Sequence, residues 1–117
     1  MLFVIDGDDL GELGQAVQKC LAASREGVPH PDRFTDLFNP ILSLAGVKSF
    51  GVFMKSAKCV EVELDAAIVT LIPTRNAGVE NGFSPLLDKA KTLDSEVADR
   101  NHYTLGLASA TALALAE

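Results

Sequence analysis

Residues 58–72 read KCVEVELDAAIVTLI, and this stretch decides the fold. In its first half, apolar residues alternate with a cysteine and two glutamates, which is the two-residue period of a half-buried strand over Lys58–Leu64. Residues Ala67–Ile72 are apolar and rich in β-branched side chains, which predicts a central strand. The intervening Asp65-Ala66 predicts a tight turn. We therefore expect an antiparallel hairpin whose second strand stops pairing at Pro73.

Two longer helices are predicted on either side of this hairpin. Asp9 precedes Glu12 by three residues, which is typical of a helix N-terminus, and apolar residues then recur at helical spacing over Leu10–Arg25. Near the other end of the sequence, the alanine-rich segment Leu105–Leu115 has a high intrinsic helix propensity. A short apolar run, Leu2–Ile5, predicts a further buried strand.

Shorter elements fill the rest of the chain. Helical spacing returns at residues 34–38, and Asn39-Pro40 predicts a helix that runs through Leu44 and stops at Gly46. Ser49 predicts the cap of another short helix.

Three segments beyond the hairpin complete the prediction. Thr74–Pro85 reads as a long polar loop, Leu87–Leu93 as a third strand, and Asp94–Asn101 as a turn. The expected fold is α+β: one domain spanning residues 1–117, with a small, mostly antiparallel sheet against two longer helices and two or three short ones.

Composition restricts the classes of partner. The chain has 117 residues, 48% of them hydrophobic and 22% charged, with a net charge of −6 and a pI of about 4.8. An acidic surface repels phosphate backbones, so direct nucleic-acid binding is not expected, and a basic partner would be attracted. Cys20 and Cys59 lack metal-binding spacing, and no signal peptide or membrane-length apolar run is visible, so a reducing cytoplasm is the expected location with no membrane partner.

No catalytic site is visible in the sequence. Asp6, Asp8 and Asp9 form the densest carboxylate cluster, but helix capping explains them more simply than a metal ion does. His30 and His102 are far apart in the chain, and no phosphate-binding or hydrolase motif occurs. We therefore expect no catalytic residue, no metal and no cofactor, which makes the protein a binding protein rather than an enzyme.

Glu61, Glu63 and Asp65 form an acidic stripe on one face of the first hairpin strand. One interpretation is structural, because Lys89 and Lys91 could pair with these acids across neighbouring strands. The other interpretation is a negatively charged docking face for a basic partner, to which an additional strand could be added if a sheet edge is free.

The segment 74–85 supplies the remaining candidate contact residues. Arg75 carries a planar set of hydrogen-bond donors, Asn76 lies beside it, and Phe83 would be an interface anchor if exposed. The alternative interpretation is that Phe83 points inward and Arg75 only holds the loop. The predicted contact set is therefore Glu61, Glu63, Asp65, Arg75, Asn76 and Phe83.

Several short segments occur in one order that resembles a known family. They are LGELGQAV at residues 10–17, GVKSF at 46–50, PTRN at 73–76, GFSPL at 82–86 and the closing helix that begins Leu105-Gly106. Together they resemble immunity proteins of bacterial contact-dependent growth inhibition systems over most of the chain.

The resemblance implies a function. A neighbouring cell delivers the C-terminal toxin domain of a large surface protein, often a nuclease, and the immunity protein binds and blocks this domain in the cytoplasm. In the family that this chain resembles, the toxin is similar to a metal-dependent DNase, and a toxin β-hairpin docks into the immunity protein. Relatives often carry extra residues before the first strand.

Two other functions remain open at this point. A small-molecule-binding or regulatory domain would contain a formed apolar pocket. A metal-assisted enzyme would use the Asp6, Asp8 and Asp9 cluster with a histidine. The sequence does not identify the cognate toxin or the oligomeric state.

Overall fold

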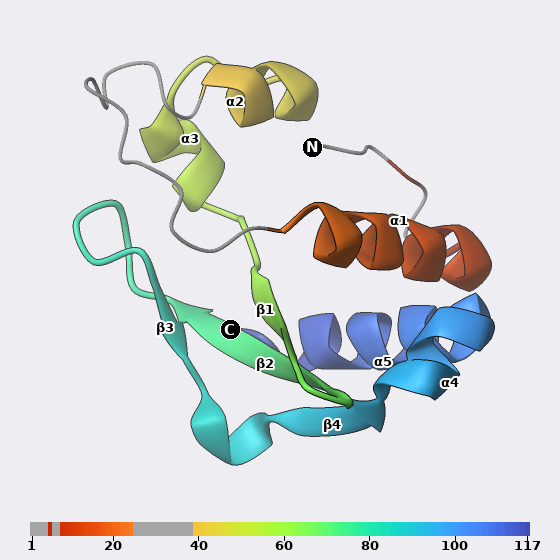
Figure 1. Cartoon of the computed structure of the whole chain (residues 1–117). Coiled ribbons are helices and arrows are strands. Elements are labelled where there is room, and N and C mark those ends of the chain that lie inside the picture. Colours follow the sequence, from red (N-terminus) through yellow and green to blue (C-terminus); the bar gives the residue numbers. More distant parts are fainter. Residues whose placement is uncertain (1–4, 6–7, 25–38) are drawn as a thin grey trace.

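The computed structural model describes residue 5, residues 8–24 and residues 39–117. Within these residues, five α-helices and a four-stranded antiparallel sheet form an α+β fold, which confirms the predicted class (Figure 1). The elements are α1 (Leu10–Ala23), α2 (Asn39–Ala45), α3 (Phe50–Met54), β1 (Val60–Asp65), β2 (Ile68–Asn76), β3 (Phe83–Pro85), the 3₁₀-helix η1 (Leu87–Lys89), β4 (Lys91–Asp94), α4 (Ser95–Arg100) and α5 (His102–Leu115).

Strand β2 is the centre of the sheet. It pairs with β1 along one side, from Asp65 opposite Ile68 to Val60 opposite Pro73. On its other side, β2 pairs with β4 through residues 68–71 and with β3 through residues 74–76. The 3₁₀-helix η1 lies between β3 and β4 in the chain and separates these two short strands. The predicted hairpin is confirmed, but its two-residue turn is Ala66-Ala67, one residue later than expected, with Ala66 at a φ of 52°.

Pro73 does not end the pairing of β2, contrary to the prediction. Its carbonyl accepts a hydrogen bond from the Leu86 N–H at 2.8 Å. The N and C=O groups of one strand residue point to the same side of the strand. Because the Pro73 carbonyl points toward Leu86, the position where Pro73 lacks an N–H also faces the gap between β3 and β4. No strand needs a donor there, so β2 continues through Pro73 to Asn76.

The segments after β2 differ most from the prediction. Thr74–Pro85 is not one long loop, because its first and last three residues pair as β2 and β3 and leave a six-residue loop at 77–82. Only the second half of Leu87–Leu93 is a strand, since its first half forms η1. Asp94–Asn101 is not a turn: Asp94 accepts a hydrogen bond from the Glu96 N–H at 2.8 Å and caps α4.

Most predicted helix ends are confirmed. The Asp9 carboxylate accepts from the Glu12 N–H at 3.0 Å at the start of α1, and the Ser49 hydroxyl accepts from the Val52 N–H at 3.2 Å at the start of α3. Helix α2 begins at Asn39 and ends before Gly46, which has a φ of 72°. Helix α5 begins three residues before its predicted start, with Asn101 as its cap. The predictions for residues 2–4, Arg25 and residues 34–38 lie outside the described residues.

The hydrophobic core lies between one face of the sheet and α5. Helix α1 packs beside α5 (Figure 1). Val69 and Leu71 of β2 are almost completely buried against Leu105 and Ala112 of α5. Partly buried residues from α1, α5, β1 and β4 close this core, namely Val17, Leu21, Val60, Val62, Leu93 and Ala108. The opposite face of the sheet is therefore the one whose side chains point away from both long helices.

Candidate docking face

A row of acidic and threonine side chains crosses the face of the sheet that points away from α1 and α5. The β1–β2 register places Glu63 opposite Thr70, and the β2–β4 register places Thr70 opposite Thr92. Residues that stand directly opposite in an antiparallel pair point to the same side. The cross-strand neighbour of Glu63 is therefore the hydroxyl group of Thr70, with Thr92 one strand further away, and no cation occupies this row in the described strands.

A second row lies one step closer to the β1–β2 turn. Asp65 stands opposite Ile68, which in turn stands opposite Asp94. On the far side of the first row, Glu61 stands opposite the buried Ile72. We call the surface formed by Glu61, Glu63, Asp65 and Asp94 the acidic face; in the described strands, every ionisable residue at these register positions is acidic.

The structure does not contain the pairing of Lys89 and Lys91 with the acidic stripe. Strand β4 is separated from β1 by β2, and Lys91 stands opposite Leu71, which points toward the helices. Lys89 lies in η1 and forms an ion pair with Glu117 at 3.1 Å. Among the described residues, no ion pair joins Glu61, Glu63 or Asp65 to a cation.

The acidic face borders the outer edge of the sheet. In the part of the chain that the structure describes, β1 pairs with β2 alone. Glu63 and Asp65 are exposed, whereas Glu61 is half-buried. An unpaired strand edge presents N–H and C=O groups to which another chain can bind, so this border combines negative charge with backbone hydrogen-bonding capacity.

Asn76 holds parts of its own chain together. Its side-chain amide donates to the carbonyl of Met54 at 2.6 Å and of Ala57 at 3.1 Å, and its side-chain oxygen accepts from the Gly78 N–H at 3.0 Å. The side chain therefore links the end of α3 and the segment before β1 to the end of β2. This arrangement gives the predicted contact residue an internal structural role.

Arg75 and Phe83 lie at the far end of β2 from the β1–β2 turn. Arg75 is exposed and stands opposite Ser84, on the side of the sheet that carries Leu71. Phe83 is half-buried and stands opposite Asn76. The structure thus brings the three stripe acids together but places Arg75 on the other side of the sheet.

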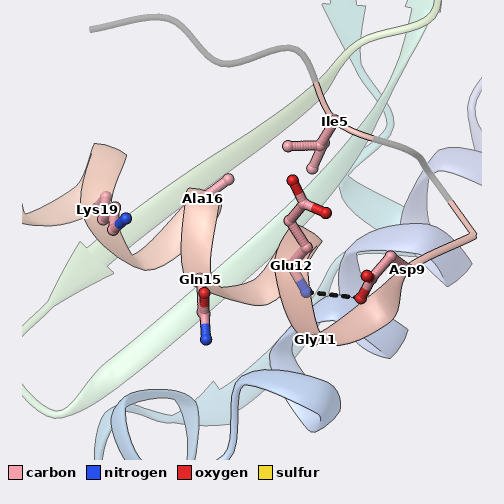
Figure 2. A pocket seen from close by; sticks show the side chains of 7 residues that line it. All are labelled: Ile5, Asp9, Gly11, Glu12, Gln15, Ala16 and Lys19. Carbon is pink, nitrogen blue, oxygen red and sulfur yellow. Dashed lines mark hydrogen bonds between the residues drawn. The ribbon is translucent and has the colours of Figure 1, made fainter.

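An open hollow along α1 and the Cys59 thiol are two further candidate sites. The hollow has a volume of about 520 Å³; its labelled side chains spread along the helix and do not converge on one point (Figure 2). Among the described residues, no three His, Cys, Asp or Glu side chains are arranged to hold a metal ion. Burial raises the pKa of the Cys59 thiol, a hydrogen bond with Thr74 opposes this shift, and the charge of Glu61 adds to it.

A smaller hollow lies where α1 and α4 meet the β1–β2 turn. It has a volume of about 210 Å³ and includes residues that the sequence analysis did not select. They are Gln18, Leu21, Leu64, Ala66, Val69, Ser95, Glu96 and Asp99. The sequence prediction does not include the α4 residues because it assigns their segment to a turn, although Asp94 followed by Ser95 and Glu96 is a recognisable helix-start pattern.

Comparison with known proteins supports the fold alone. No family model and no curated protein sequence matches the chain. Its structure is similar to that of a protein of unknown function, NMB0488 from Neisseria meningitidis, with a TM-score of 0.72 and 18% sequence identity over all of this chain and 75% of the other. None of the helices in the described residues has the length and apolar character needed to cross a membrane.

Proposed function

We propose that this chain is an immunity protein that binds and neutralises the C-terminal toxin domain of a contact-dependent growth inhibition system. The observation that carries the proposal is the acidic face. Among the described residues, its Glu61, Glu63 and Asp65 have no cationic partner, and the edge of β1 beside them pairs with no other strand. The order of sequence segments that resembles this family supplies the biological context.

The charge of the acidic face suits the proposed target. A nuclease domain must present a basic surface to nucleic acid. Electrostatic attraction can steer an acidic inhibitor onto that surface before the two proteins touch. The edge of β1 that the described residues leave unpaired offers backbone groups to a toxin β-hairpin, which is the docking element that the family resemblance implies. Charge would then accelerate association, and strand pairing with apolar contacts would determine how long the complex lasts.

The proposed mechanism needs no chemical turnover by this chain. One immunity protein covers one toxin domain in the cytoplasm, and the toxin is inactive for as long as the complex persists. The rival proposal of a small-molecule-binding domain has less support. One hollow, of about 210 Å³, is smaller than the roughly 300–1,000 Å³ typical of small-molecule sites, and the hollows of about 520 and 330 Å³ are both open to solvent.

Co-expression provides the direct test. The C-terminal domain encoded by the gene immediately upstream would be produced with an affinity tag, together with this chain. We expect a one-to-one complex that survives purification, and cells that grow only when this chain is present. If the upstream gene encodes no such domain, or if the domain neither binds this chain nor is inhibited by it, the proposed function is wrong.

A further inference from the structure

The small hollow between α1, α4 and the β1–β2 turn has an apolar floor. Leu64 stands opposite Val69 in the hairpin, and Leu21 approaches from α1. Val69 belongs to the core and is 1% exposed, whereas its cross-strand neighbour Leu64 is 51% exposed. The core therefore continues outward into an apolar surface that the described residues leave open.

The rim of the same hollow is acidic. Glu96 and Asp99 are three residues apart on α4, a spacing that places them on neighbouring positions of one helix face. Asp99 accepts a hydrogen bond from the side-chain amide of Gln18, which is a neutral donor and does not compensate its charge. The hollow lies at the same end of the sheet as Asp65 and Asp94, so it extends the acidic face around the turn.

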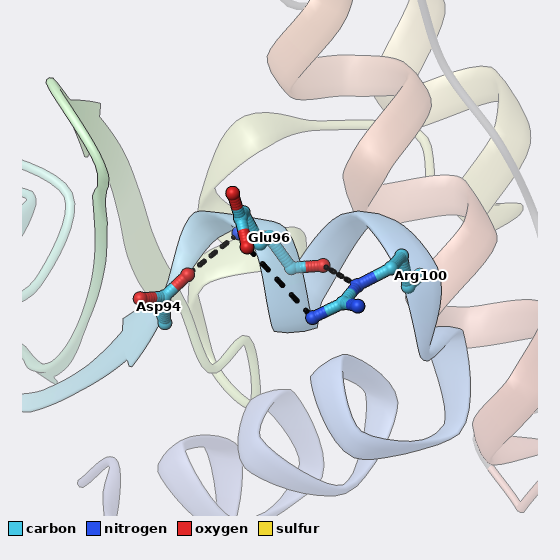
Figure 3. A network of polar contacts seen from close by, with 3 residues as sticks. All are labelled: Asp94, Glu96 and Arg100. Atoms are coloured by element: carbon cyan, nitrogen blue, oxygen red, sulfur yellow. Dashed lines mark hydrogen bonds and ion pairs between the residues drawn. The ribbon is translucent and has the colours of Figure 1, made fainter.

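One cation already lies close to this rim. Arg100 donates from Nε to the Glu96 backbone carbonyl at 3.3 Å, and its Nη2 lies 3.8 Å from the Glu96 carboxylate (Figure 3). Both side chains are more than 70% exposed, so this ion pair is weak and can be exchanged for another at little cost. In the part of the chain that the structure describes, the rim thus has one acid with a loosely held cation, Glu96, and one acid without an ion pair, Asp99.

The size and lining of the hollow indicate what it accepts. A volume of about 210 Å³ is below the usual range for small molecules, but it can hold the end of one long side chain. Arginine has an aliphatic stem that packs on apolar surface and a planar charged head with several donors, which matches an apolar floor below two carboxylates. We propose that this hollow, lined by Leu64 and rimmed by Glu96 and Asp99, is a specificity pocket for one arginine side chain of a basic partner protein.

This inference rests on the proposed function for the identity of the partner, the toxin domain encoded upstream. The probe is that purified domain, and its affinity is measured by isothermal titration calorimetry at two salt concentrations. The rim variant Glu96→Gln with Asp99→Asn is compared with Glu80→Gln and Asp88→Asn, which removes two exposed acidic charges elsewhere. The floor variant Leu64→Ala is compared with Leu44→Ala, since Leu44 is 50% exposed on α2 and matches Leu64 in type and exposure.

We expect each pocket variant to weaken binding tenfold or more, and each control to change it less than threefold. Each arginine of the toxin domain is then replaced by alanine, and the affinity is measured with the wild-type chain and with the rim variant. The occupant is the arginine whose replacement weakens binding to the wild-type chain but not to the rim variant. If the wild-type chain binds but the pocket variants behave like their controls, or if no arginine is coupled to the rim, the pocket proposal is wrong and the proposed function stands. If the wild-type chain does not bind the domain, both proposals fail.

Discussion

Gly14 of α1 and Gly106 of α5 face each other where the two long helices are in backbone contact. A Cβ placed on Gly14 would lie 1.7 Å from the carbonyl oxygen of His102, and one placed on Gly106 would lie 1.8 Å from the carbonyl oxygen of Leu10. The reciprocal positions show that each glycine admits a carbonyl from the opposite helix. This contact fixes the distance of α1 from α5 and hence the position of α1 beside the core.

Gly14→Ala should therefore destabilise the protein. An added methyl group would meet backbone atoms that cannot rotate away, so the helices must separate, and overpacking of this kind costs about 2 kcal/mol or more even after the better helix propensity of alanine is included. The control is Gly11→Ala on the same helix, where the nearest atom to the new Cβ is 3.7 Å away. Urea unfolding should show Gly11→Ala equal to or more stable than the wild type; equal loss in both variants would contradict the close contact.

Asn76→Ala should also lower the free energy of unfolding, by about 2 kcal/mol, because two backbone carbonyls and one N–H lose their partner in a partly buried site. The matched control is Asn81→Ala in the same loop region. Asn81 is exposed, and its side chain makes one long hydrogen bond, 3.4 Å, to the Ala77 carbonyl. A change within about 0.5 kcal/mol is expected for this control. Equal stability of the two variants in urea would show that Asn76 does not hold α3 to the sheet.

Cys59 should react more slowly with iodoacetamide at pH 8 than Cys20. The attacking species is the thiolate, and burial raises the pKa of the Cys59 thiol, whereas Cys20 is exposed. We expect at least a tenfold difference in rate, measured by mass spectrometry of the alkylated peptides. In 6 M guanidinium chloride the two rates should converge; a difference that persists there would contradict burial as the cause.

The same shift has a consequence for stability. A thiol whose pKa is higher in the folded state than in the unfolded state keeps its proton longer when folded, so its stabilising effect is complete below the unfolded pKa and is lost as the pH rises toward the folded value. The free energy of unfolding should therefore fall above about pH 9, near the ordinary thiol pKa. Cys59→Ala should remove this part of the pH dependence, and an unchanged alkaline slope in that variant would contradict the assignment.

The sequence predicts the hairpin and both long helices because their signals are local. Alternation over Lys58–Leu64 and the Asp9 cap act within a few residues, and both are found where expected. Helix α4 has a local start signal at Asp94, but its six residues, SEVADR, are too few to show apolar periodicity. The helix also depends on burial of Ala98, which is 1% exposed. Its stability comes from packing that a local pattern does not contain.

The order of strands is the second feature that local patterns do not contain. The sequence leaves a pairing of Lys89 and Lys91 with the acids open because it does not show that β2 separates β4 from β1. It also does not show that η1 lies beside Pro73, where the missing N–H faces the gap between β3 and β4. The acidic stripe itself was predicted from sequence. Its extension to Asp94 follows from strand pairing, and its extension to Glu96 and Asp99 follows from the position of α4 beside the β1–β2 turn. Both are features of the folded protein.

The acidic face leads to a prediction for complex formation. Glu61→Lys combined with Glu63→Lys should weaken binding of the upstream-encoded domain by a factor of ten or more, because two attractive charges become repulsive at a strand edge. The slope of log affinity against log salt concentration should fall as well, since fewer opposite charges are brought together. Most of the change should appear in the association rate if the charges act mainly by steering.

The matched control for this prediction is Glu80→Lys combined with Asp88→Lys, which changes the net charge equally at two exposed sites off the acidic face. A general effect of net charge would weaken both double variants alike, whereas a local docking face would affect only the first. Because Glu63 is exposed and Glu61 is half-buried without an ion pair among the described residues, both double variants should keep their unfolding midpoint within a few degrees. Unchanged affinity and unchanged salt dependence in the Glu61 and Glu63 variant would show that the partner binds elsewhere on the protein.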